Sequence, residues 1–219
     1  MGRMADLKEL ESAVGHDLNN VLQVVLGNLE LLKRRREYIP QTVEAALGAT
    51  RQAADLADRL LTLRRLQRPE VRPLDLNRLA EDLAQVARET LGDAIRVETD
   101  LAADLPSARA DVRAVHVALR ELAANARAAM PQGGRFVLRT AKAPQNALLL
   151  ELADTGSGMA PERLARAFEP LLSRGERGKP RGLGLYIAEC AIRESGGRLE
   201  LDSAPDAGTR VRIYLPADK

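Results

Sequence analysis

The chain has 219 residues, of which 45% are hydrophobic and 29% charged, and its formal net charge at pH 7 is +2. This composition predicts a folded, soluble protein with room for two small domains. Because the net charge is small and acids are interspersed with basic residues, a nucleic-acid surface is not expected. Cys190 is the only cysteine, which excludes a disulfide framework and fits a reducing compartment.

Membrane segments are not expected in this chain. No apolar run approaches the roughly 20 residues that cross a bilayer. Residues 1–11 also lack the apolar core of a signal peptide. We therefore expect a cytoplasmic location and no membrane contact by this chain itself.

Residues 1–68 are predicted to form two long helices. A near-heptad apolar spacing predicts the first over about 5–37, Pro40 interrupts the pattern, and a second helix is expected from 41 to about 67. Two such helices joined by a short turn form an antiparallel hairpin. One hairpin leaves its apolar stripe half covered, so we expect a homodimer built around an all-α four-helix bundle. The alternative is that the hairpin docks on the rest of its own chain.

The pattern changes after residues 69–73, a charged stretch with two prolines that is predicted to be a linker. Over residues 74–219 we expect an α+β sandwich, with helices on one face of a mixed sheet. Turn signals at 131–134 and 206–208 fit antiparallel strand pairs. The expected helices span about 76–91, 112–129 and 181–195, and the expected strands about 94–100, 135–141, 147–154, 198–203 and 209–216.

The first candidate site lies in the first predicted helix. His16 falls outside the apolar stripe, so its imidazole should reach solvent, and Asn20 follows one turn later on the same face. With an unperturbed pKa of about 6.5, a neutral imidazole is available at neutral pH to accept a phosphoryl group. The neighbouring Asp17 can orient the ring and accept its proton. Taken alone, the segment is better explained as a solvated histidine among ordinary polar neighbours.

A second candidate is the pair Glu121 and Asn125, spaced i, i+4 on one face of a predicted helix. Both offer oxygen ligands. Mg²⁺ selects such oxygens, keeps several of its waters and shares the remaining positions with nucleotide phosphates. When the pair is considered alone, a surface glutamate and a capping asparagine explain it better.

A third candidate follows a predicted strand. Asp154 stands at the strand end, where a carboxylate can accept a hydrogen bond from an exocyclic amine. Gly156 and Gly158 come next, and glycines let the backbone approach a ligand closely. A tight turn without a ligand is the plainer alternative.

A fourth candidate opens the predicted helix near residue 182, where glycines would admit phosphate to the helix N-terminal amides. Lys179 and Arg181 precede it. The cation-rich and glycine-rich segment 168–181 is predicted to be a mobile lid over the phosphates. It is not a Walker-type loop, because no G-x-x-x-x-G-K-[ST] sequence occurs.

Taken in order, these motifs resemble the signature of sensor histidine kinases. Residues 16–20 resemble the phosphoacceptor box in its H-D-x-N-N variant. The later motifs resemble the N box (121–129), the first glycine box (154–159), the phenylalanine box (168–170), the second glycine box (182–185) and a short C-terminal glycine motif (208–209). Each motif alone is weak or moderate, but their order and spacing across essentially the whole chain make the resemblance specific.

The resemblance implies a helical-hairpin domain for dimerisation and histidine phosphotransfer over residues 1–68, followed by an ATP-binding domain of the Bergerat type over 74–219. It implies ATP-dependent autophosphorylation on His16 and phosphoryl transfer to an aspartate of a response-regulator receiver domain, and it leaves phosphatase activity open. The implied cofactors are ATP and Mg²⁺.

By matched position, the resemblance also implies roles for individual residues. His16 would be the phosphoacceptor and Asp17 the general base, while Asn20 would position a water for dephosphorylating the partner. Metal coordination would fall to Asn125 and Glu121. The implied nucleotide-binding residues are Asn125, Asp154, Gly156, Gly158, Lys179, Arg181, Gly182, Leu183, Gly184, Leu185 and Thr209.

One departure from the family pattern keeps alternatives open. Glu121 stands where these kinases more often have asparagine, whereas a glutamate there is frequent in related chaperone and mismatch-repair ATPases, where it activates water. An ATP-hydrolysing conformational machine is therefore one alternative. A histidine phosphotransferase without kinase activity is another, although Asn125 and Asp154 are both present and argue against it.

Overall fold

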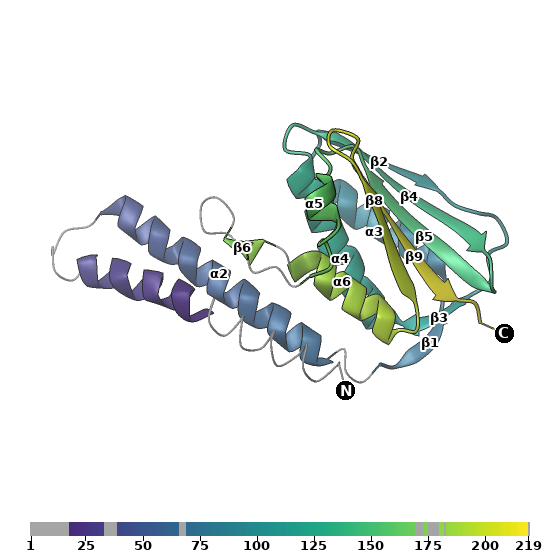
Figure 1. Ribbon diagram of the computed structural model, residues 1–219, viewed down its shortest axis with the longest axis horizontal. Helices are drawn as coiled ribbons and strands as arrows, with labels where there is room; N and C mark the ends of the chain where they lie inside the picture. The colour runs from purple at the N-terminus through teal and green to yellow at the C-terminus, as the bar shows by residue number, and fades with distance from the viewer. Residues whose placement is uncertain are drawn as a thin grey trace. The chain divides into compact units, whose positions relative to one another are not determined.

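The structure is a computed structural model that describes residues 18–32, 39–65, 69–169, 173–174, 180–181 and 183–218 (Figure 1). The chain divides into two compact units. The first comprises Met1–Arg64 with Pro170–Leu183, and the second comprises Arg65–Glu169 with Gly184–Lys219. Among the described residues, no helix combines the length and the apolarity needed to span a bilayer.

The first unit contains the predicted helical hairpin. Residues 18–32 are helical, within the expected first helix, and α2 spans Pro40–Arg65. Pro40 opens α2 rather than merely interrupting the first helix, because a proline at the first helical position lacks an N–H that would in any case have no partner. The N–H groups of Thr42 and Val43 both donate to the carbonyl of Ile39, at 3.0 and 3.2 Å. His16 and Asp17 lie outside the described residues.

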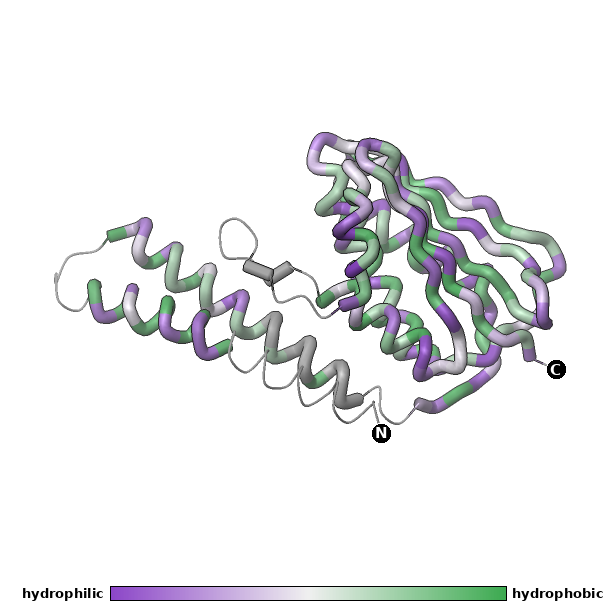
Figure 2. Tube along the Cα trace, viewed as in Figure 1, coloured by the Kyte–Doolittle hydropathy of each residue, from purple (hydrophilic) through white to green (hydrophobic). Residues whose placement is uncertain are grey.

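Large apolar side chains remain exposed on this hairpin. Among the α2 side chains that the structure describes, the buried ones are small: Ala46, Ala49 and Ala53. Helix 18–32 exposes five large apolar side chains by 43–59%: Leu22, Val24, Leu26, Leu29 and Leu31. Figure 2 shows apolar residues recurring along both helices. A single chain therefore leaves a substantial apolar surface uncovered here.

The second unit is built on a five-stranded sheet with the strand order β2-β4-β5-β9-β8. The strands β2 and β4 run parallel and the other neighbours antiparallel, which confirms the predicted mixed sheet. The strands are β2 (Ile95–Asp100), β4 (Gly134–Ala143), β5 (Ala147–Asp154), β8 (Arg198–Ser203) and β9 (Thr209–Pro216). As predicted, three helices cover one face of the sheet (Figure 1): α3 (Leu76–Thr90), α4 (Val112–Ala129) and α6 (Leu183–Glu194).

Alternation along the strands separates an apolar face from a charged one. The largest fully buried side chains include Phe136, Leu150 and Ile213, which point toward the helices. On the opposite face, cross-strand neighbours alternate in charge along what we call the outer charged row: Asp100, Arg139, Glu151, Arg212 and Glu200. Two pairs of neighbours in the row also form ion pairs, with Arg139 3.2 Å from Asp100 and Arg212 3.0 Å from Glu151. Such cross-strand pairs support the sheet.

The predicted linker is wrong in part. Residues 71–73 belong to β1 (Val71–Leu74), which pairs antiparallel with β3 (Ala108–Asp111). Pro73 is tolerated because β3 is the only strand that β1 pairs with among the described residues, so Pro73 lies on an edge strand. β3 itself was not predicted. Its last residue, Asp111, then caps α4 by accepting the N–H groups of Arg113 and Ala114.

One of the two predicted strand turns is also wrong. Residues 131–134 connect α4 to β4, so they join a helix to a strand rather than two antiparallel strands. The turn 206–208 does join β8 to β9, as predicted. Three short elements were not predicted: α5 (Pro161–Leu164), β6 (Ser173–Arg174) and β7 (Pro180–Arg181).

Candidate functional site

Helix α4 and the first turn of α6 meet at Gly184. A Cβ at this position would lie 3.0 Å from Oε2 of Glu121 and 3.3–3.4 Å from the amide atoms of Asn125. Both α4 side chains therefore face the α6 backbone, and a side chain at position 184 would require them to shift by a few tenths of an ångström. The predicted i, i+4 pair and part of the predicted second glycine motif thus lie against each other in the structure.

The two α4 side chains differ in burial. The Glu121 side chain is 7% exposed, with a guanidinium nitrogen of Arg120 3.8 Å from its Oε1, whereas Asn125 is exposed. A buried carboxylate is costly unless it is paired or bound to a cation. The described residues contain no group of three or more His, Cys, Asp or Glu that could hold a metal alone. Two oxygen donors do fit Mg²⁺, which takes its other ligands from water and nucleotide phosphates.

Asp154 ends β5 and is held by two backbone donors. The N–H of Gly156 donates to its Oδ1 at 2.8 Å, and the backbone N–H of Thr209, on the adjacent strand, also donates to the carboxylate. Burial is the largest influence on Asp154 and raises the pKa of its carboxyl group, and the two hydrogen bonds only partly oppose it. A partly desolvated carboxylate of this kind is well suited to bind a polar hydrogen from a ligand.

The turn before β9 packs tightly onto Asp154. Gly208 has φ +77°, and a Cβ there would collide with the carbonyl oxygen of Asp154. The Ser203 hydroxyl donates to the Gly208 carbonyl at 2.8 Å and lies 3.0 Å from Oγ1 of Thr209. Ser203 was not predicted as a site residue. Its position opposite Thr209 in a hairpin is the signal that could have found it.

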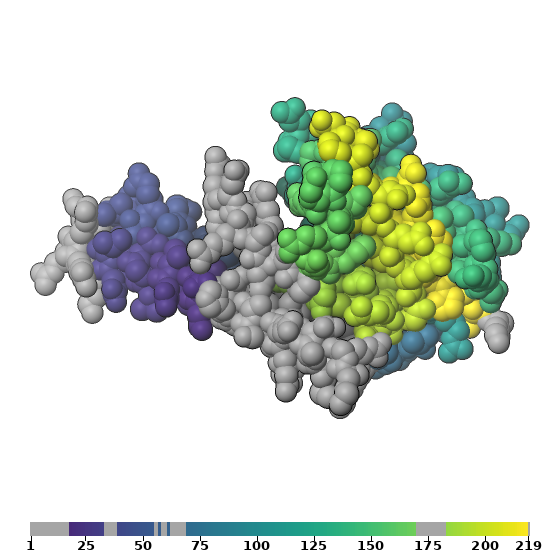
Figure 3. All heavy atoms as spheres, in the orientation of Figure 1, coloured from purple at the N-terminus to yellow at the C-terminus, as the bar shows by residue number. Residues whose placement is uncertain are grey.

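The loop after Asp154 is also joined to the end of α4. A Cβ at Gly156 would lie 2.6 Å from the Cβ of Ala129, and the N–H of Ser157 donates to the Ala129 carbonyl at 3.0 Å. On its other side, the N–H of Asp206 donates to the Ser157 carbonyl at 2.9 Å, and Figure 3 shows the green segment after β5 beside the yellow β8–β9 turn. One helix, α4, therefore links the Asn125 and Asp154 ends of the site.

The remaining predicted residues are described incompletely. Leu183 is buried and Leu185 half-buried at the start of α6. The backbone of Arg181 lies in β7, but its side chain is outside the described part of the chain, as are Lys179 and Gly182. Of the first motif, only Asn20 is described, half-buried in helix 18–32.

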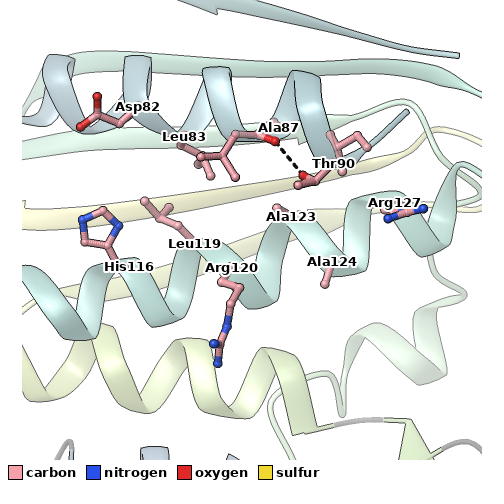
Figure 4. A pocket seen from close by; sticks show the side chains of 12 residues that line it. Asp82, Leu83, Ala87, Thr90, His116, Leu119, Arg120, Ala123, Ala124 and Arg127 are labelled. Carbon is pink, nitrogen blue, oxygen red and sulfur yellow. Dashed lines mark hydrogen bonds between the residues drawn. The ribbon is translucent and has the colours of Figure 1, made fainter. Parts of the chain in front are cut away.

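A hollow of about 540 Å³ lies on the opposite flank of α4, between α4 and α3 (Figure 4). None of the predicted nucleotide or metal residues lines it. Sequence reasoning missed this feature, because its shape depends on how two helices that are distant in sequence pack together. It is a separate feature from the site around Asn125 and Asp154.

With this geometry established, comparison with known proteins defines the class. The family model of histidine kinase-, DNA gyrase B- and HSP90-like ATPases matches residues 110–219. The match covers α4, the Asp154 loop, α6 and the last two strands. The chain therefore belongs to this ATPase family.

Relatives that the chain resembles include sensor kinases. The sensor kinase CckA of Brucella abortus is 32% identical over 98% of this chain and 24% of its own length. The sensory histidine kinase/phosphatase NtrB of Escherichia coli O157:H7 is 29% identical over 97% of this chain and 63% of its own length. The chain thus spans about a quarter of the first relative and less than two thirds of the second.

Solved structures show the same fold. Histidine kinase AdeS of Acinetobacter baumannii matches with a TM-score of 0.70 at 18% identity, over 93% of this chain and 98% of that one. Histidine kinase ThkA in complex with the response regulator TrrA matches with a TM-score of 0.76 at 16% identity, over 99% of this chain and 64% of that one. The order of a helical hairpin and an α/β ATP-binding domain is therefore shared with histidine kinases.

Proposed function

We propose that the chain is the catalytic core of a sensor histidine kinase. It transfers a phosphoryl group from ATP to His16 and then to an aspartate of a response-regulator receiver domain. The observation that carries this proposal is the meeting of Glu121 and Asn125 with the α6 backbone at Gly184, on the helix whose end is bonded to the Asp154 loop. Motifs that are far apart in sequence thus form one neighbourhood, which offers groups suited to both the base and the phosphates of a nucleotide.

Each end of this neighbourhood suits a different part of ATP. Asp154, already desolvated, accepts a hydrogen bond from the exocyclic amine of adenine, with Gly156, Gly158 and Thr209 shaping its surroundings. The α6 N-terminus directs amide N–H groups at phosphate oxygens. This turn is supplied by residues 182–185, which are Gly182, Leu183, Gly184 and Leu185. Cationic charge is added by Lys179 and Arg181.

Asn125 and Glu121 hold Mg²⁺ in this proposal. Their oxygens are the hard ligands that this ion prefers, and its charge neutralises the phosphates when bound. The exposed Asn125 side chain can contact the nucleotide directly, whereas the Glu121 side chain supports the metal ion from its buried position. Positioning and charge neutralisation, rather than covalent chemistry on the ATP-binding unit, account for catalysis of phosphoryl transfer.

The reaction then takes place on the hairpin. A neutral imidazole nitrogen of His16 forms a bond to the γ-phosphorus while the bond to the bridging oxygen of the ADP leaving group breaks. Asp17 accepts the imidazole proton. A carboxylate oxygen of the receiver aspartate next takes the phosphoryl group, which returns His16 to its free form. Asn20, one turn after His16, positions a water for hydrolysis of the phosphorylated partner.

The hairpin is also the proposed dimer interface. The exposed apolar side chains of helix 18–32 would be covered when two hairpins pair into a four-helix bundle. We propose that residues 1–68 form this dimerisation and phosphotransfer domain in the cytoplasm, and that 74–219 form the ATP-binding domain.

The test is incubation of the purified chain with γ-labelled ATP and Mg²⁺, with His16→Ala as the matched control. The expected product is a label that is lost in acid, survives alkali and is absent from the variant. A label that persists in His16→Ala would assign the phosphoryl group to another residue. Binding of ATP without any label would contradict the kinase proposal.

ATP hydrolysis coupled to conformational change is a second candidate, favoured by the burial of Glu121 beside the α6 turn. A buried carboxylate could activate water for attack on the γ-phosphate. Steady release of inorganic phosphate, with no label on His16, would support this function instead.

A further inference from the structure

The hollow between α3 and α4 is apolar at its centre. Leu83 of α3 faces Leu119 and Ala123 of α4 across it (Figure 4), and Val86 of α3 also lines it. The small side chain of Ala123 leaves the space open, and Val86 remains 52% exposed at its rim. A packed helix pair normally fills such a space with larger side chains. This volume, about 540 Å³, falls within the range of about 300–1,000 Å³ that is usual for small-molecule sites.

One end of the hollow carries a cation that has no counter-ion among the residues that the structure describes. Arg127, exposed in the last turn of α4, lines the hollow, and no carboxylate of the described residues lies within ion-pair distance of its guanidinium. Arg120 is already 3.8 Å from the Glu121 carboxylate, and its side chain points away from α3 in Figure 4. The only lining carboxylate, Asp82, stands near His116 at the opposite end.

We propose that this hollow binds a small amphipathic anion with a slender apolar body and a single carboxylate, such as a free medium-chain fatty acid. The apolar body covers Val86 and Leu83, and the carboxylate pairs with Arg127. The polarity of the lining decides the orientation: a carboxylate placed at the other end would meet Asp82 and be repelled. His116 and Arg127 are eleven positions apart on α4, a rise of about 16 Å, and this length suits an extended chain better than a compact ring.

Occupation of this hollow is coupled to nucleotide binding through α4. One flank of the helix lines the hollow, and the other presents Glu121 and Asn125 to the α6 turn. A ligand that wedges between α3 and α4 shifts or stiffens the helix that carries the candidate metal ligands. Because such coupling is reciprocal, the anion and the nucleotide change each other's affinity by the same factor.

Binding is tested first, without reference to catalysis. Decanoate is titrated calorimetrically into the purified full chain, with decanol as the uncharged probe of equal length. We expect saturable binding of one decanoate per chain with a dissociation constant of about 1 mM or lower, and weaker binding of decanol. Absence of saturable binding below the concentration at which decanoate forms micelles overturns the proposal, as does equal binding of the two probes.

Paired variants locate the site. Ala123→Leu fills the hollow and should weaken decanoate binding by about tenfold or more, whereas Gln85→Leu adds the same side chain to an exposed part of α3 and should change nothing. Arg127→Gln should reduce decanoate affinity to that of decanol, with Arg88→Gln as the matched loss of charge outside the hollow. Thermal unfolding confirms that each variant is folded. Unchanged binding in folded Ala123→Leu would place the ligand elsewhere and refute the site.

Coupling is measured with a non-hydrolysable ATP analogue. Saturating decanoate should change the analogue's affinity in the unmodified chain and leave it unchanged in Ala123→Leu. This measurement does not depend on phosphorylation of His16, so loss of kinase activity and loss of the hollow's ligand give distinguishable results. Decanoate binding without any effect on the analogue would retain the site and refute the coupling.

Discussion

The carboxylate of Asp111 accepts the backbone N–H of Glu70 at 2.8 Å, across 41 residues of chain. The same side chain caps α4 through the N–H groups of Arg113 and Ala114. One buried carboxylate therefore fastens the residues just before β1 to the first turn of the helix that carries Glu121 and Asn125. A displacement at the start of β1 would therefore be transmitted through the Asp111 side chain to the N-terminus of α4.

Replacing Asp111 should cost more stability than replacing the comparable cap of α3. Asp75 caps α3 through Asn77 and Arg78 but is exposed, whereas Asp111 is buried and holds an additional backbone group. We expect a loss of about 2 kcal/mol or more in unfolding free energy for Asp111→Ala and about 1 kcal/mol for Asp75→Ala. Urea unfolding of both variants measures the difference, and equal losses would contradict the role of Glu70.

The same carboxylate gives a pH dependence of known sign. Burial alone would raise the pKa of Asp111, but hydrogen bonds from the Glu70 backbone, the Arg113 side chain and the first α4 amides lower it below its ordinary value. Its contribution is therefore complete above the unfolded pKa of about 3.9 and is lost as pH falls through the lower native pKa. The destabilisation caused by Asp111→Ala should accordingly shrink at strongly acid pH.

Asp154→Asn should weaken ATP binding while leaving the fold intact. The amide retains the shape but loses the charge that accepts the adenine amine, so we expect affinity to fall by about 10- to 100-fold. Because burial raises the pKa of Asp154, protonation should weaken nucleotide binding in the unmodified chain at a higher pH than an ordinary aspartate would. Isothermal titration across acid pH tests both statements. Equal affinity in the variant would remove Asp154 from the site.

Gly184→Ala should impair nucleotide binding more than stability. The added Cβ would lie 3.0 Å from the Glu121 carboxylate and displace it or Asn125. We expect a loss of about tenfold in ATP affinity. Gly48→Ala in α2, where nothing lies within 4 Å, should instead raise stability by about 0.5–1 kcal/mol without affecting ATP. If the two substitutions had the same effect on ATP affinity, the close approach of Gly184 to Glu121 and Asn125 would not be important for nucleotide binding.

The substitution Glu121→Gln distinguishes between two roles for Glu121, that of a metal ligand and that of a general base. The amide still offers an oxygen but no charge, so the kinase proposal expects a higher Mg²⁺ concentration for half-maximal labelling and a rate about tenfold lower when Mg²⁺ is limiting. The hydrolytic alternative expects phosphate release to disappear at every Mg²⁺ concentration. Labelling and phosphate release are followed in parallel over a Mg²⁺ titration.

Local sequence patterns were sufficient to predict much of the secondary structure of the second unit. The bounds of α4, β5, β8 and β9 were predicted correctly, because each has a clean periodicity and ends at a capping or turn residue. The ribbon of β1 and β3 was missed, because its partners are far apart in sequence and rich in alanine, arginine and proline. Strand pairing of that kind depends on tertiary contacts rather than on propensity.

The candidate site was likewise predictable from local sequence only in part. Asp154 at a strand end and the Glu121–Asn125 face of α4 follow from local spacing. The contact of Gly184 with α4 and that of Ala129 with the Asp154 loop do not, because they depend on how distant elements pack. Family resemblance brought these motifs together before the structure did, since the order of motifs carries information that single spacings lack.

The outer charged row constrains how this chain can change over evolutionary time. Arg212 on β9 contacts both Glu151 on β5 and Asp202 on β8, so loss of the guanidinium leaves an unpaired acid on each of the two strands that flank β9. A substitution that reverses one charge in the row creates repulsion with both neighbours. Relatives that differ at Arg139 should therefore differ at Asp100 or Glu151 as well, and this face of the sheet should evolve by paired exchanges rather than by single steps.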